Sequence, residues 1–153
     1  MTTCLDEVIA SLASIATAIG DLEPFAPWVE FVPGVAQGVN VGTDVVYISE
    51  YQLINGRLKV QIHATMLNAG TSGEVIRIAL PVSPGGLSIV KQVGYGYVRR
   101  GTNGLLYGGS VFVSGTNEVA IWSWQPNSIV GTDPAFAVAP GDVLSLSIDT
   151  RVV

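Results

Sequence analysis

The chain has 153 residues and a formal net charge of −5 with its one histidine neutral, and 48% of its residues are hydrophobic against 12% charged. This length fits one domain that buries its own core, and the hydrophobic share excludes an intrinsically disordered chain. One cysteine cannot form an internal disulfide. A sequence pI of about 4.6 with only 7 Lys+Arg argues against nucleic acid as a partner. The sequence has no uninterrupted run of about 18 apolar residues, so we expect no membrane insertion.

Residues 2–23 are predicted to form a helix, because Thr3 can cap the first turn and Asp6 and Glu7 lie where the helix dipole favours negative charge. Its apolar residues recur at alternating spacings of three and four, which is the a/d pattern of a coiled coil. The predicted seam consists of Leu5, Val8, Leu12, Ile15, Ile19 and Leu22.

Ile9 and Ala16 widen this apolar stripe, which favours three or more helices, and we therefore expect a homotrimer. The alternative is an amphipathic helix that packs on its own β-domain, since such a helix shows the same spacing. The acidic start and the absence of a preceding Lys/Arg region argue against a secretory signal, which predicts a protein folded in a cytoplasm.

From Trp28 onward the apolar period changes to two, as in β-strands. The clearest signal is Asn55-Gly56, the preferred pair for a two-residue type I′ hairpin turn. After it, apolar and polar residues alternate from Leu58 to Met66. The predicted strands are Trp28–Val32, Asp44–Ile54, Arg57–Met66, Glu74–Pro81, Leu87–Val98, Leu105–Val113, Glu118–Gln125 and Val143–Val152.

About eight strands with 18 Gly and 8 Pro among the residues predict an all-β fold, a jelly-roll-like antiparallel β-sandwich preceded by a short N-terminal α-helix. A closed barrel is the alternative. The expected organisation is a helix over 1–23, a linker and first strand over 24–42, and the sandwich over 43–153. The segment 126–140 is expected to be a crossing connection or an exposed functional loop.

No catalytic, cofactor or metal site is predicted. His63 falls on the polar face of a strand without a nucleophile or acid partner nearby in sequence, and Cys4 has no companion. The acidic residues are scattered beside turns and helix ends, so no ligand set for a metal emerges. The glycine-rich segment 94–104 precedes no helix and therefore cannot form a helix-terminus phosphate site. We expect no enzyme and no cofactor.

Two aromatic pairs are spaced i, i+2 and therefore share one face of a strand: Trp122 with Trp124, and Tyr95 with Tyr97. Such pairs belong to the core, to a subunit interface, or to a carbohydrate-binding platform. In the last case Arg99, Arg100 and Tyr107, which are nearby in sequence, would supply polar groups that reach the sugar.

Residues 47–82 and 138–151 resemble the small β-sandwich domains in minor tail proteins of tailed phages that infect actinobacteria. The shared features are the aromatic Tyr51, the turn Asn55-Gly56-Arg57, a small-residue turn from Gly70 to Gly73, and Leu80-Pro81 at a strand end. The resemblance covers most of residues 28–150 and implies a trimeric jelly-roll-like domain on a virion surface without catalytic residues. Long fibre or collagen-like segments of that family are absent here, which favours a compact cap or decoration.

The sequence therefore predicts a phage virion structural protein, a minor tail protein of the tail tip or baseplate, which assembles in the host cytoplasm. Its expected partners are itself, other virion proteins and, as a candidate, a host cell-surface glycan. The alternatives are a capsid decoration protein and a stand-alone carbohydrate-binding module.

Overall fold

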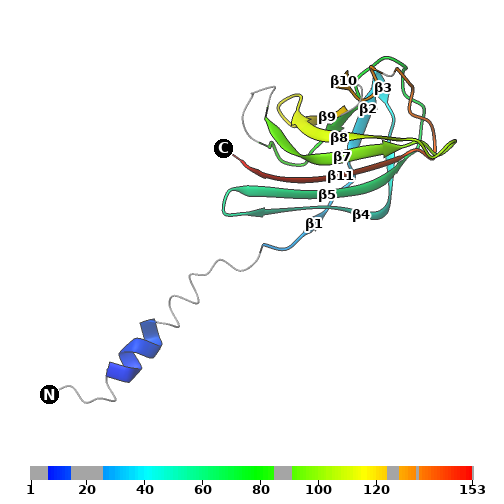
Figure 1. Ribbon diagram of the computed structural model, residues 1–153. Helices are drawn as coiled ribbons and strands as arrows, with labels where there is room; N and C mark the ends of the chain where they lie inside the picture. Colours follow the sequence, from blue (N-terminus) through cyan, green and yellow to red (C-terminus); the bar gives the residue numbers. More distant parts are fainter. Residues whose placement is uncertain (1–6, 15–25, 85–90, 124–127, 134, 153) are drawn as a thin grey trace.

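The fold is mostly β, with one short helix, as Figure 1 shows. The computed structural model describes residues 7–14, 26–84, 91–123, 128–133 and 135–152. The predicted all-β class is confirmed: the described strands form a single curled antiparallel sheet. Its order is β1-β4-β5-β11-β7-β8-β9-β6-β2-β3, and β10 pairs with β9.

The strands differ widely in length, and the long ones form one half of the sheet. Their bounds are β1 Val29–Glu30, β2 Gly34–Gln37, β3 Val39–Asn40, β4 Thr43–Ile54, β5 Arg57–Met66, β6 Arg77–Ala79, β7 Gln92–Arg99, β8 Leu106–Val113, β9 Glu118–Ser123, β10 Ser128–Ile129 and β11 Val143–Arg151.

The β4–β5 hairpin forms as predicted. Asn55 and Gly56 both have positive φ, 48° and 68°, which is the conformation a type I′ turn requires. Along β5 the even-numbered residues from Leu58 to Met66 are all buried, while the odd-numbered ones are exposed or half-buried. One face of this strand therefore belongs to the core and the other to the outer surface.

Glycines allow the sheet to curl where β11, β7, β8 and β9 meet. A Cβ on Gly94 would collide with the carbonyl oxygen of Ser147 in β11, and a Cβ on Gly109 would collide with that of Trp122 in β9. Irregular pairing between β7 and β8 adds to the bend. Since no side chain fits at these positions, glycine is required for neighbouring strands to approach at this angle.

The core lies inside the curl and collects side chains from both halves of the sheet. Leu58, Ile62, Leu144 and Ile148 come from the long strands β5 and β11, and Ile78 comes from the short β6 on the opposite side. Because each of these is at most 2% exposed, the two halves enclose a dry interior.

The boundary predicted at residue 43 differs from the structure. The segment 24–42, expected to be a linker with one strand, contains β1, β2 and β3, and it buries Val35, Gln37 and Val41. The β-domain therefore includes these residues. Its short strands lack a long alternating pattern, which is why the period of two did not identify β2 and β3.

A buried amide fixes the loop between β10 and β11. Gln37 is fully buried, and its Nε2 donates to the carbonyl oxygens of Phe136 at 2.7 Å and Glu74 at 3.1 Å. Its Oε1 accepts from the backbone N–H of Val138 at 2.8 Å. Phe136 and Val138 are themselves buried, so this part of the predicted loop 126–140 packs into the core.

A second buried polar group joins the β7–β8 turn to the start of β11. The fully buried Asp142 accepts hydrogen bonds from the backbone N–H groups of Gly101 and Ala139, at 2.8 and 3.0 Å. Arg100 Nε lies 2.8 Å from Asp142 Oδ2, although without the alignment of a hydrogen bond. The guanidinium also covers the Phe136 ring at 4.9 Å.

Candidate functional site

The outer face of the long strands presents two rows of side chains, which the strand register defines. In the first row His63 of β5, Ser145 of β11, Tyr97 of β7 and Gly108 of β8 lie opposite one another. Neighbouring strands lie about 4.8 Å apart. The backbones of His63 and Tyr97 are therefore about 10 Å apart, with Ser145 between them.

The second row runs parallel to the first and contains Gln61, Ser147, Tyr95, Ser110 and Trp122, from β5, β11, β7, β8 and β9 respectively. As in the first row, small residues alternate with larger side chains, and in this row both small residues are serines. The rows place polar and aromatic groups side by side although they are far apart in sequence.

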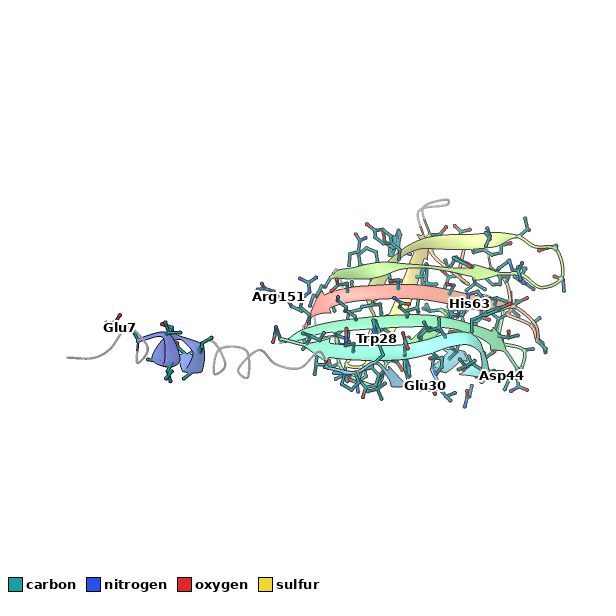
Figure 2. All side chains as sticks on the ribbon, turned by 90° about the horizontal axis from the view of Figure 1, so that it is seen from below. Glu7, Trp28, Glu30, Asp44, His63 and Arg151 are labelled. Carbon is teal, nitrogen blue, oxygen red and sulfur yellow. The ribbon has the colours of Figure 1, made fainter. Side chains whose placement is uncertain are left out.

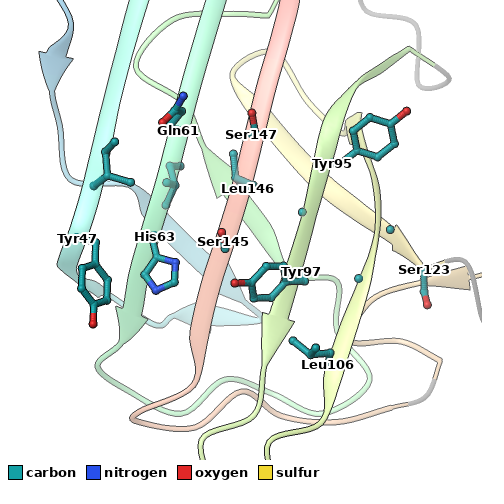
Figure 3. Close-up of a pocket in the computed structure, with 15 residues that line it drawn as sticks. Tyr47, Gln61, His63, Tyr95, Tyr97, Leu106, Ser123, Ser145, Leu146 and Ser147 are labelled. Atoms are coloured by element: carbon teal, nitrogen blue, oxygen red, sulfur yellow. The ribbon is translucent and has the colours of Figure 1, made fainter.

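Residues of both rows, although not Ser110 or Trp122, line an open trough of about 1290 Å³ that crosses β4, β5, β11, β7 and β8 and reaches Ser123 of β9 (Figure 3). We call it the outer trough. Tyr47 and His63 stand at one end, and Leu106 stands toward the other. In Figure 3 the ring of Tyr97 points from β7 toward β11, near Ser145, whereas Tyr95 points the other way.

Tyr47 reaches the trough because of an irregularity in β4. The pairing of β4 with β5 shifts between Val45 and Ile48, so that Tyr47 lies in the shifted segment. Its side chain is 80% exposed, and its ring meets His63 edge-on with the centroids 5.0 Å apart. Figure 2 shows His63 toward the end of the sheet that carries Asp44, away from Arg151. A strand irregularity has thus added an aromatic ring to the end of the trough.

Small residues give the trough its depth. Ser147 is exposed and Ser145 is half-buried, and both project from β11 between larger side chains on β5 and β7. On the far side of β7, Gly108 adds no side chain at all. The hydroxyl and amide groups of Ser147 and Gln61 are therefore accessible from solvent, together with the ring of Tyr95, which is 60% exposed.

Among the described residues that line the trough there is no Asp, Glu, Lys or Arg. The charged residues of the same face lie outside it: Glu50 pairs with Gln61, Arg99 pairs with Val143, and Lys59 and Asp149 pair with each other two residues beyond Gln61 and Ser147. The site therefore offers neutral hydrogen-bonding groups and aromatic rings, and its described lining has no charged side chain that could pair with an ionic ligand.

The aromatic residues singled out in the sequence are partly brought together. Tyr95 and Tyr97 line the trough, and Trp122, which is 39% exposed, lies on the same face two strands from Tyr95 without lining it. Trp124 lies outside the described residues. Trp122 and Tyr95 are not in the core of the chain, which leaves the interface and platform alternatives. Arg100 and Tyr107 instead contact Phe136.

Only part of the predicted helix is described, at residues 7–14, and all of these residues are exposed. Val8 and Leu12 of the predicted seam are 48% and 60% exposed. Over these residues the helix does not bury its stripe on the β-domain, and association with another chain remains the prediction. Leu5, Ile15, Ile19, Leu22 and Cys4 lie outside the described residues.

Across the described ranges no group of three or more His, Cys, Asp or Glu is placed to hold a metal ion. His63 lies on the outer face of β5, as the alternation predicted, with Tyr47 as its ring contact. Within the described part of the chain, no helix has the length and apolar character needed to cross a membrane.

Comparison with known proteins identifies no relative: no family profile, no curated protein and no solved structure matches this chain.

The sequence missed Tyr47, Gln61, Ser145 and Ser147 as members of the site. Each has an ordinary surface pattern in its own strand, and only the pairing of β5, β11 and β7 brings them to one trough. The alternation of β5 did indicate that Gln61 faces outward, and for the other three residues the sequence analysis drew no such direction.

Proposed function

We propose that this chain is a virion structural protein of a tailed phage, a minor tail protein that forms a homotrimer and presents its β-domain on the particle surface. In this proposal the curled sheet is a jelly-roll-like sandwich. Two supports come from the sequence: the resemblance over residues 47–82 and 138–151, and the heptad spacing of the N-terminal segment.

The structural observation that carries the proposal is that the β-domain completes its core without the helix. None of the buried residues of the described core comes from residues 7–14. Val8, Ile9 and Leu12 are left exposed, and burying each such side chain is worth about 1.5–3 kcal/mol. A surface of this kind gains stability by association with copies of itself or with a neighbouring protein.

The first test is the mass of the full chain by light scattering, beside a chain that begins at Trp28. We expect a trimer that dissociates when the helix is removed. Val8→Asp combined with Leu12→Asp should have the same effect, because charges would enter the seam, while the exposed positions make the change harmless to a single chain. A monomer in the full chain would contradict the trimer.

The second test concerns location on the particle. Mass spectrometry of separated tails and heads from the phage that encodes the chain should detect it on tails. Detection on heads alone would favour a capsid decoration protein, and absence from both would refute a virion role.

A further inference from the structure

We infer that the outer trough is a binding site for an uncharged oligosaccharide, with Tyr97 and Tyr47 supplying ring surfaces and Gln61, His63 and Ser147 supplying hydrogen bonds. The inference concerns the isolated chain and does not require the virion role, so the two can fail independently.

The first argument is the chemistry of the lining. A sugar ring has an apolar C–H face and a rim of hydroxyl groups, so a site for it combines aromatic surfaces with neutral donors and acceptors. The outer trough has this combination: rings from β4, β5 and β7 flank the side chains of Gln61 and Ser147. A purely apolar ligand would leave these polar groups without partners.

The second argument is charge. The lining residues that the structure describes include neither acidic nor basic side chains, and the whole chain has a net charge of −5. An anionic glycan or a phosphorylated ligand would find no Lys or Arg in the trough and would meet a repulsive protein field. A cationic peptide would be attracted by the net charge but would find no carboxylate to pair with among the described lining residues. Neutral ligands are therefore favoured.

The third argument is size and shape. The volume of about 1290 Å³ exceeds the range of about 300–1,000 Å³ for pockets that enclose a small molecule. His63 and Tyr97 arise from strands two apart, whose backbones are about 10 Å from each other. An open trough with rings at intervals suits an extended chain of several sugars better than a single sugar.

A second copy of this chain is the competing occupant. Interfaces between protein subunits contain fewer serines than the rest of the protein surface, and their buried centre is more apolar. The centre of this trough is formed by Ser145 and Ser147 instead. The glycan therefore fits the middle of the site better than a protein surface does.

The test is an array of defined oligosaccharides, with neutral hexose and N-acetylhexosamine chains and with sulfated and uronic-acid chains, probed with the purified full-length protein. We expect binding to neutral chains only. Ser147→Trp should abolish binding, because Ser147 is exposed in the trough and a large side chain there occupies the floor without disturbing the core. Tyr97→Ala should weaken binding by about tenfold, the factor that corresponds to one lost ring stack.

Matched controls separate the site from general effects. Ser72→Trp makes the same change at an exposed turn position outside the trough, and Trp28→Ala removes an exposed ring that does not line it. Both should bind as the unchanged protein does, and melting curves would verify that every variant is folded. Gln61→Ala, at an exposed position of β5, gives a second variant within the trough.

Three results would overturn the inference. They are no binding to any neutral chain, equal or stronger binding to the anionic chains, and full binding by folded Ser147→Trp. A lower mass of Ser147→Trp in light scattering, with no glycan bound by the unchanged protein, would assign the trough to a subunit interface instead.

Discussion

Removing the carboxylate of Asp142 should destabilise the β-domain strongly. Asp142 is fully buried, Arg100 is 17% exposed at its side chain, and the pair is separated by 2.8 Å. In Asp142→Ala the guanidinium loses its counter-charge, and the N–H groups of Gly101 and Ala139 lose their acceptor. Removing one partner of a buried pair costs about 3–5 kcal/mol.

The structure places the expected value toward the lower end of this range. Arg100 Nε and Asp142 Oδ2 are close without the alignment of a hydrogen bond, and Arg100 keeps its contact with the Phe136 ring. Such a cation–π contact is worth about 0.5–2 kcal/mol. We therefore expect a loss of about 3 kcal/mol, which lowers the melting temperature by roughly 10 °C in a chain of this size.

The free energy of unfolding of each variant is measured by urea denaturation, and an unchanged m-value shows that a shifted midpoint reports stability. The matched control is Asp149→Ala. Asp149 Oδ1 and Arg57 Nη2 are also 2.8 Å apart, but both side chains are about half exposed. An exposed pair contributes about 0–1 kcal/mol. Equal losses for Asp142→Ala and Asp149→Ala would refute the argument that burial, and not ion-pair distance, determines the cost.

Three further substitutions test the fold. Gly56→Val should cost about 1–2 kcal/mol, because a β-branched residue resists the φ of 68° in the hairpin turn; an unchanged midpoint in thermal unfolding would contradict the turn type. Gln37→Leu fills a similar volume but leaves the N–H of Val138 and two carbonyl groups without partners, at about 1–3 kcal/mol for a buried group. Hydrogen exchange at Val138 should accelerate as the loop loosens, and equal protection in both proteins would count against the anchor. Gly109→Ala places a methyl group against the Trp122 carbonyl and should cost about 1–3 kcal/mol in chemical unfolding; a neutral result would show that the sheet relaxes there.

The long strands were predictable because their pattern is local. Strand β5 begins and ends at the predicted residues, and β11 and β8 differ from prediction by one residue at one end. The shorter strands could not be predicted in this way. Strand β6 covers only Arg77–Ala79 within the predicted Glu74–Pro81, and β2 and β3 gave no sequence signal. Segments of two to four residues show too few alternations, and their pairing partners determine that they are strands.

The β class, the hairpin at Asn55-Gly56 and the outward direction of His63 follow from the sequence alone, since these depend on φ preferences and on the period of two within one segment. For Tyr95 and Tyr97 the sequence left core, interface and platform open, and the structure puts both on the outer face. Tertiary structure alone decided which outward residues meet. The order β5-β11-β7 places Ser147 between Gln61 and Tyr95. Such pairing joins segments more than 30 residues apart, and the register between them is fixed by the packing of the common core rather than by either strand alone.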